Sequence, residues 1–377
     1  MEHEGGGGEQ HTEHRCESRI SRDLLPALSQ RAAMLLANLP ADVVALVLVQ
    51  LGRGKGRASD IARVAPTCRA LRDAARAAEK AHRRVCFEHG SGVTCVAAAP
   101  GGRVLVGSDD RTIKVWRDGA CERTIQGKAV AVLPSGARFV SGSHDGTAKL
   151  WTTGGALERT FAMGDRVLVV AALPDGVHFV VGCYGYNGVR LYHVDGTLVH
   201  SFEVHYSTAS TLAVTPDGQH IITPDGQKLL GEKDTLVKVW SVATKSLVST
   251  CACTIHEALG HTGMVFAVAA MPDSQRIISS SRGDVRVHLL NGTLENTFDL
   301  HADSYALVAL PDNQHALSGS GDATVKLFNV NDGTVLRTFM HHTGRVECLA
   351  LLPDGLRFVS GSGDGTARIV DHGLVTQ

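Results

Sequence analysis

The sequence predicts a mainly β fold: a seven-bladed β-propeller over residues 83–377, preceded by a small α-helical segment. A short apolar run followed by proline recurs seven times, at intervals of 34 to 56 residues. Each period of about 40 residues holds four short apolar runs, the number of strands in one propeller blade. Glycine is abundant (41 residues) while aromatic residues make up only 5%, as is typical of short strands joined by tight turns. The repeated prolines are Pro100, Pro134, Pro174, Pro216, Pro272, Pro311 and Pro353.

Two residue types recur at fixed points of the repeat. Every tryptophan lies six residues after an aspartate, in the pairs Asp110 and Trp116, Asp145 and Trp151, and Asp234 and Trp240. A tryptophan suits a place between blades where its N–H finds a polar partner, and an aspartate can accept hydrogen bonds within its own turn. The aspartate recurs at Asp322 and Asp364, where Phe328 and Val370 replace the tryptophan. The corresponding position falls near Tyr192 in blade three and His288 in blade five.

With these features, residues 85–377 resemble the WD-repeat family. In that family a His, a Ser or Thr, the Asp and the Trp form a hydrogen-bonded set inside a blade. Blade four comes nearest to the full set, with His205, Thr223, Asp234 and Trp240, whereas blade two has no preceding histidine. The resemblance implies a protein-interaction platform without catalytic activity.

The last blade lacks an evident fourth strand. Its third strand ends near His372, and only a short tail follows. Residues 83–88, just before blade one, have the pattern of the other fourth strands. We therefore expect them to form the outer strand of blade seven, which would remove an exposed sheet edge.

The chain ahead of the propeller divides into three parts. Residues 1–20 are polar and rich in Gly, Glu and His, as in a disordered tail. Residues 21–36 form a predicted helical lead-in, and residues 37–82 continue with helical periodicity. From Gln50 to Arg84 the net charge is +7. This charge could complement an acidic partner, could contact RNA or lipid, or could belong to a solvated helix face.

Residues 37–82 contain a Leu-Pro start, an apolar run ending at a leucine, an Asp-Ile helix and a Thr-Cys-Arg-Ala-Leu-Arg helix. The segment resembles an F-box, although six residues at 52–57 lengthen its first loop and Leu71 replaces the usual tryptophan. The resemblance implies docking to a Skp-type adaptor within a cullin complex. The adaptor-binding residues would be Leu39, Pro40, Val43, Val44, Val47, Leu51, Ile61, Val64 and Leu71. The alternative is that these helices only brace the propeller.

Composition and motifs argue against several other functions. The net charge of −1 is not that of a protein that coats nucleic acid or an anionic membrane. Nine scattered cysteines, without a CxxC pair or an export signal, favour free thiols in the cytoplasm or nucleus. Gly361–Gly365 lies between two strands and does not precede a helix, so it is not a phosphate loop. We expect no enzyme activity, metal, cofactor or membrane association.

The candidate target surface lies on blades three and four. Blade four has the longest interval, with its excess in residues 223–234 and 251–262, and both segments would emerge on one face. Tyrosine and histidine at loop tips are common binding anchors. The predicted contacts are Tyr184, Tyr186, Asn187, His205 and Tyr206. The alternative explanation for these irregular loops is that the repeat has degenerated in blades three and four. The sequence Thr-Pro-Asp-Gly-Gln occurs at both 215–219 and 223–227, and if the second copy forms the hairpin turn, the insertion lies on the opposite face.

Together these features predict the substrate-recognition subunit of an SCF-type ubiquitin ligase. The F-box-like segment would dock the adaptor and the propeller would hold an unknown target protein, raising its effective concentration near the ligation machinery. The alternatives are a WD-repeat scaffold without a ubiquitin role, or an RNA-associated propeller that uses the basic helices.

Overall fold

The computed structural model describes residues 86–185, 188–204, 211–229, 232–251, 265–300 and 303–374. The chain divides into two compact units, Met1–Arg84 and Val85–Gln377, and the described residues belong to the second. The predicted tail, helical lead-in and F-box-like segment therefore lie outside the described residues. Within the described ranges, no helix is long and apolar enough to cross a membrane.

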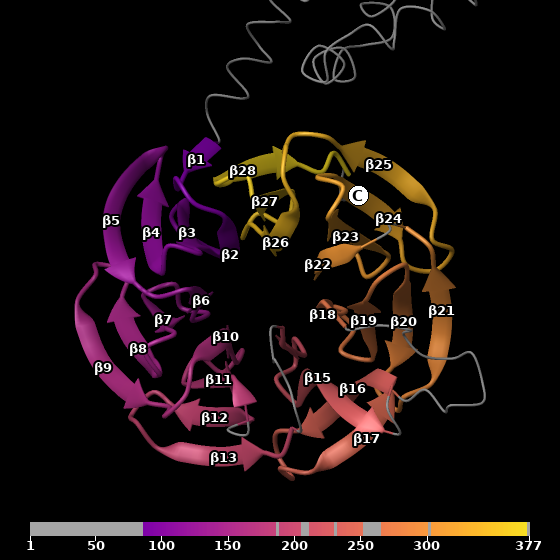
Figure 1. The fold of residues 1–377 in the computed structure, drawn as a ribbon, viewed down its shortest axis with the longest axis horizontal. Helices are drawn as coiled ribbons and strands as arrows, with labels where there is room; N and C mark the ends of the chain where they lie inside the picture. The colour runs from indigo at the N-terminus through magenta and orange to yellow at the C-terminus, as the bar shows by residue number, and fades with distance from the viewer. Residues whose placement is uncertain are drawn as a thin grey trace, which may run out of the picture. The chain divides into compact units, whose positions relative to one another are not determined.

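The second unit is a ring of seven antiparallel sheets, each of four strands (Figure 1). Blade one comprises β2 (Val93–Ala99), β3 (Arg103–Ser108), β4 (Thr112–Arg117) and β5 (Ala120–Gln126). Blade two comprises β6 (Ala129–Val132), β7 (Arg138–Gly142), β8 (Thr147–Thr152) and β9 (Leu157–Ala162). Blade three comprises β10 (Val167–Ala172), β11 (His178–Cys183), β12 (Val189–His193) and β13 (Leu198–Phe202). Blade four comprises β14 (Ala213–Val214), β15 (His220–Leu229), β16 (Glu232–Ser241) and β17 (Leu247–Cys251).

The remaining three blades follow the same order from the ring axis outward (Figure 1). Blade five comprises β18 (Ala267–Ala270), β19 (Arg276–Ser280), β20 (Val285–Leu289) and β21 (Leu294–Phe298). Blade six comprises β22 (Ser304–Ala309), β23 (His315–Ser320), β24 (Val325–Asn329) and β25 (Val335–Phe339). Blade seven begins with β26 (Val346–Leu351), β27 (Arg357–Ser362) and β28 (Thr366–Asp371). These bounds agree with the mainly β, seven-bladed fold that the sequence predicts.

Blade seven takes its outer strand from the other end of the propeller. Strand β1 (Cys86–Glu88) pairs antiparallel with β28, with Phe87 opposite Ala367. The sheet order is therefore β26-β27-β28-β1, and the strand lies inside the range 83–88 expected for it. The backbone N–H of His89 continues the pairing by donating to the carbonyl of Gly365 at 2.8 Å. Backbone hydrogen bonds thus join the segment just before blade one to the last strand of the chain and close the ring.

Strand register confirms which residues take the tryptophan position. Each tryptophan lies opposite an apolar residue of the second strand: Trp116 opposite Val104, Trp151 opposite Phe139, and Trp240 opposite Ile221. The same place in the other four blades holds Tyr192, His288, Phe328 and Val370. Phe328 is fully buried, so an apolar ring fills the site even without a polar partner.

The core consists of apolar clusters between neighbouring blades. The cluster that joins blade seven to blade one contains Phe87, Val93, Val104, Val359 and Ala367. The place of Phe87 at the end of an outer strand is repeated by large apolar residues in most other blades, including Phe161, Phe202 and Phe339. Burial of such a side chain is worth about 1.5–3 kcal/mol, so each blade stabilises its neighbours.

The turn between the second and third strands explains the repeated aspartate. In blade two, the Asp145 carboxylate accepts hydrogen bonds from the backbone N–H and the hydroxyl of Thr147, at 2.8 and 2.6 Å. Gly146 follows with a φ of +81°, a conformation that favours glycine. The same Asp–Thr pair of hydrogen bonds occurs at Asp110, Asp322 and Asp364. The aspartate therefore stabilises its own turn, as predicted.

The six cysteines in the described part of the chain are free thiols. Cys183 and Cys251 are buried, whereas Cys121 is exposed and the other three are half-buried. Burial raises the pKa of Cys251 to about 12 and that of Cys183 to about 11. The thiolate forms are therefore disfavoured at neutral pH, which lowers their reactivity.

Candidate functional site

One end of the ring gathers the connections that vary most between blades. Because the four strands of a blade are consecutive and antiparallel, the turn between its second and third strands lies at the same end as the connection to the next blade. We call this end the upper face. Loops held by a rigid scaffold are common binding sites, so the upper face is the candidate functional surface.

Tyr184 is the one predicted target-binding residue that the described ranges contain. It follows β11 on the upper face and is 48% exposed. The guanidinium carbon of Arg166 lies 5.9 Å from the centre of its ring, and the Tyr184 backbone N–H donates to the Arg166 carbonyl at 2.8 Å. Tyr186, Asn187, His205 and Tyr206 lie outside the described residues, so the rest of this patch stays a prediction.

The extra residues of blade four form a longer hairpin. Strands β15 and β16 have 10 residues each and remain paired as far as Leu229 and Glu232. The copy of Thr-Pro-Asp-Gly-Gln at 223–227 lies inside β15. The copy at 215–219 forms the turn between β14 and β15, where the Thr215 hydroxyl donates to Asp217 at 2.5 Å. The hairpin therefore extends from the upper face. Of the second excess segment, residues 251–262, all but Cys251 lie outside the described residues.

Two blades show the tryptophan–hydroxyl hydrogen bond expected from the repeat. Trp151 Nε1–H donates to Ser141 Oγ in blade two, and Trp240 Nε1–H donates to Thr223 Oγ1 in blade four, both at 2.9 Å. His205 and the side chain of Asp234 are outside what the structure describes. Of the four residues predicted to form a hydrogen-bonded set in blade four, the structure therefore describes only the bond between Trp240 and Thr223.

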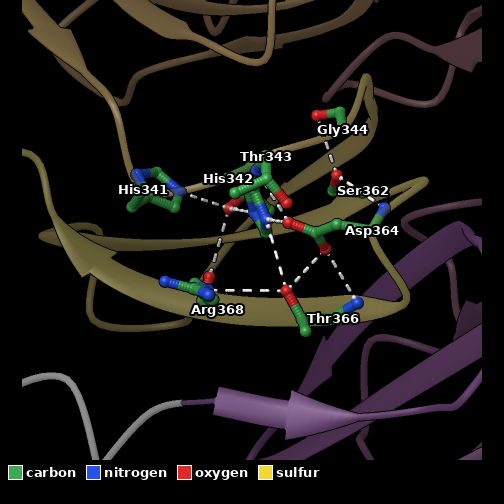
Figure 2. Close-up of polar contacts among 9 residues, drawn as sticks. His341, His342, Thr343, Gly344, Ser362, Asp364, Thr366 and Arg368 are labelled. Carbon is green, nitrogen blue, oxygen red and sulfur yellow. Dashed lines mark hydrogen bonds and ion pairs between the residues drawn. The ribbon is translucent and has the colours of Figure 1, made fainter. Parts of the chain in front are cut away.

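Blade seven lacks the tryptophan but has an extensive polar network (Figure 2). The buried His342 ring contacts Asp364 Oδ2 through Nδ1 at 3.0 Å and Ser360 Oγ through Nε2 at 2.8 Å. Asp364 also accepts from the Thr343 backbone N–H at 3.0 Å and from the Thr366 hydroxyl at 2.7 Å. Burial alone would raise the pKa of the Asp364 carboxyl, but these donors hold it well below its usual range. The carboxylate therefore stays ionised and fixes the connection that enters blade seven.

Blade one has the histidine and aspartate but lacks the hydroxyl. His89 Nδ1 lies 3.3 Å from Asp110 Oδ2, and Val106 occupies the position of Ser141. Among the described residues, neither Trp116 Nε1 nor His89 Nε2 has a hydrogen-bond partner, although both atoms are buried. Burial lowers the pKa of His89, with Asp110 opposing the shift. A buried N–H without an acceptor lowers the stability of the folded state. In blade one this cost arises at Trp116, because Val106 supplies no hydroxyl to accept its N–H.

Replacing Val106 by threonine is therefore expected to stabilise the propeller. The new hydroxyl would accept from Trp116 Nε1, as Thr223 does from Trp240 in blade four. A net hydrogen bond contributes about 1 kcal/mol. Chemical denaturation should show a free energy of unfolding higher by about that amount.

Val181 supplies the matched control for this substitution. It is fully buried at the same position of blade three, where Tyr192 replaces the tryptophan. Val181→Thr adds a hydroxyl without an indole N–H to satisfy, so the free energy of unfolding should fall by about 1 kcal/mol or more. Equal effects of the two substitutions would contradict this account of blade one.

The sequence interpretation missed one tyrosine on the upper face, Tyr305. Tyr305 lies at a bulge in β22, where the register shifts between Ser304 and Ala306. The same bulge occurs at Thr94 in blade one and Glu347 in blade seven. Aligning the blades on the first residues of their innermost strands would have placed Tyr305 beside these positions.

Among the described residues there is no group of three or more side chains that could hold a metal ion.

The family model for the WD domain, G-beta repeat, matches residues 81–117, 119–152, 196–241, 249–288, 292–329 and 333–371. These matches cover more than half of the chain, which therefore belongs to the WD-repeat family. The unmatched interval contains most of blade three, where Val181 and Tyr192 replace the usual hydroxyl and tryptophan.

Two curated relatives are similar over part of their length. Autophagy-related protein 16 of Arabidopsis thaliana is 21% identical over 263 residues, covering 66% of this chain and 49% of the relative. The tRNA (guanine-N(7)-)-methyltransferase non-catalytic subunit wuho of Drosophila grimshawi is 37% identical over 92 residues, 22% of each protein. The chain thus spans about half or less of the curated relatives it matches.

Proposed function

We propose that this chain is a non-catalytic platform that holds a target protein on the upper face of its propeller. The observation that carries the proposal is the closed ring of seven sheets, which fixes the loops of seven blades in one surface. Tyr184 supplies a half-exposed aromatic anchor with Arg166 beside it. One relative is named as a non-catalytic subunit, which agrees with a role in binding.

The more specific proposal is a target-recognition subunit of an SCF-type ubiquitin ligase acting in the cytoplasm or nucleus. Its support is the F-box-like pattern at residues 39–71, which begins with Leu39 and Pro40. An amphipathic helix that lays its apolar face in a partner groove is a common recognition mode. In this role the chain performs no chemistry and brings its target close to the ligation machinery.

Co-purification with a Skp-type adaptor tests this role. The wild-type chain should retain the purified adaptor, and the combined substitution Leu39→Asp, Pro40→Ala and Val47→Asp should abolish retention, because charges would replace the apolar docking face. Arg357→Ala, which changes an exposed residue at the start of β27 in the propeller, is the control and should retain the adaptor. If the wild-type chain does not retain the adaptor, the ligase role is excluded and the scaffold role without ubiquitin remains.

A second variant tests the predicted target patch. Alanine at Tyr184, Tyr186 and Tyr206 together should abolish capture of the target that co-purifies with the wild-type chain, while adaptor retention is unchanged. Loss of central aromatic anchors costs about 2 kcal/mol or more each. The melting temperature should stay close to that of the wild type because Tyr184 is half-exposed. Unchanged capture would exclude this patch.

The RNA-associated alternative predicts a different result. The name of the second relative concerns tRNA modification, and residues 50–84 of this chain are basic. Binding of a tRNA probe by the full chain that weakens steeply with salt would support this alternative and count against the ligase role.

A further inference from the structure

Tyr305 is the centre of an aromatic–arginine cluster on the upper face of blades five to seven. Its ring centre lies 4.7 Å from that of Phe266, which stands just before β18. On blade seven, the Arg345 guanidinium carbon lies 5.4 Å from the centre of the same ring. Phe266 and Tyr305 are half-buried and Arg345 is exposed. The three side chains come from three consecutive blades and form one contiguous surface.

A glycine makes room for the tyrosine ring. A Cβ atom on Gly321 would lie 3.1 Å from Tyr305 Cε2, closer than ordinary contact. The φ of Gly321 is outside the left-handed region, so the backbone itself would accept alanine. Because Gly321 has no side chain, the Tyr305 ring can pack directly against the turn that follows β23.

The charges of the cluster are arranged with the positive groups outermost. Arg345 pairs with Glu347 at 2.8 Å, and their side chains are 59% and 23% exposed. Arg282 pairs with Asp303 at 3.3 Å, and theirs are 73% and 30% exposed. Asp303 lies next to the tyrosine, because its carbonyl accepts from the Gly321 backbone N–H. The carboxylates therefore lie beneath, and the guanidinium groups face solvent.

We propose that this cluster binds an extended segment of a partner protein that presents an apolar side chain next to Asp or Glu. The proposal rests on the protein-binding role of the upper face and specifies the chemistry of the partner. The apolar side chain covers the Phe266–Tyr305 pair, and the acidic side chain pairs with Arg345 or Arg282.

The observations favour this occupant over others. A guanidinium has five N–H donors in a planar fork, so Arg345 keeps donors for a second carboxylate beyond its bond to Glu347. Tyrosine and arginine are enriched among residues that dominate binding energy, and half-buried aromatic rings gain from complete desolvation. A basic segment would be repelled by the two exposed guanidinium groups. A nucleic-acid backbone would be repelled by the carboxylates of Asp303 and Glu347, which lie next to those groups.

Selection from a phage-displayed random peptide library on the immobilised full-length chain tests this proposal. Enriched peptides should share an apolar residue next to Asp or Glu. The strongest is then synthesised with fluorescein and its Kd measured by anisotropy. Tyr305→Ala and Arg345→Ala should each weaken binding at least about 30-fold, as expected for a dominant contact. Gly321→Ala should also weaken it, because the added Cβ displaces the Tyr305 ring.

The control is Arg117→Ala, which removes an arginine that pairs with a glutamate, as Arg345 does, but lies at the last residue of β4 in blade one. Arg117→Ala should leave the Kd unchanged, and the melting temperatures of all variants should stay near that of the wild type. A basic consensus, no enrichment, or a Kd insensitive to Tyr305→Ala would each overturn the proposal. Peptide binding that is lost in Tyr184→Ala would overturn the assignment of the site to the Tyr305 cluster but would still support the role of the chain as a protein-binding platform. Binding of an RNA oligonucleotide that is lost in Arg345→Ala would overturn the assignment to a protein segment.

Discussion

Replacing Phe87 by alanine is expected to lower the free energy of unfolding by about 3–5 kcal/mol, the usual cost of removing a buried phenylalanine. Phe87 is 4% exposed and lies in β1, opposite Ala367 of β28. Its ring centre is 5.4 Å from that of Trp116 in blade one. The substitution therefore removes packing between the two blades that close the ring. Denaturant titration followed by tryptophan fluorescence and circular dichroism measures the change.

Two control substitutions show whether the loss comes from ring closure. Phe161→Ala removes the equivalent ring of blade two, which is 5% exposed, and should cost a similar amount. Leu336→Ala changes an outer-strand residue that is 48% exposed and should alter stability by no more than about 0.5 kcal/mol. A Phe87→Ala effect as small as that of Leu336→Ala would mean that β1 does not pack in blade seven.

The second large effect is expected at Asp364. Alanine there leaves the His342 ring N–H, the Thr343 N–H and the Thr366 hydroxyl without their carboxylate acceptor (Figure 2). A buried donor left without its acceptor costs about 1–3 kcal/mol, and the His342 ring is fully buried. Denaturant titration at neutral pH should show this loss. Asp145→Ala should cost less, because Asp145 is exposed and bonds mainly to its own turn.

The same network predicts a pH dependence. Because the folded-state pKa of Asp364 is depressed, its stabilisation is fully present above the unfolded pKa of about 3.9 and is lost as pH falls from there toward the folded value. Asp364→Asn cannot ionise, so its free energy of unfolding should depend less on pH in that acidic range. Parallel pH profiles for wild type and variant would contradict the assignment.

Much of the fold could be predicted from the sequence because the repeat has a physical basis in every blade. The aspartate stabilises its own turn, so it recurs where the chain must reverse, as in Asp145 with Thr147. The position of the tryptophan was also predictable through its replacements. Tyr192 and His288 occupy it in the strand register.

The blade-four hairpin could not be predicted, because the same five residues occur twice. The structure gives the physical reason for the outcome. Pro224 lacks an N–H, and β14 pairs only with Ile221 and Ile222 of β15, so Pro224 lies beyond the inner partner strand. A proline is tolerated in a strand where no neighbour needs its N–H.

The upper-face cluster escaped prediction for a different reason. A bulge places two residues opposite one and turns a side chain out of the strand alternation, as at Tyr305. Period-two patterns along β22 therefore do not show where Tyr305 lies. Its contacts with Phe266 and Arg345 join residues about 40 apart in sequence, one blade repeat on each side. The F-box-like segment lies outside the described residues and stays a prediction.

Closure of the ring by Cys86–Glu88 is the central claim, because it fixes the loops of all seven blades in one upper face. Hydrogen–deuterium exchange of the full-length chain, followed by mass spectrometry, tests it most directly. The peptide that contains Cys86–Glu88 should exchange as slowly as the one that contains β28, and Phe87→Ala should accelerate both. Exchange of Cys86–Glu88 at the rate of an unstructured peptide, with β28 still protected, would contradict the claim.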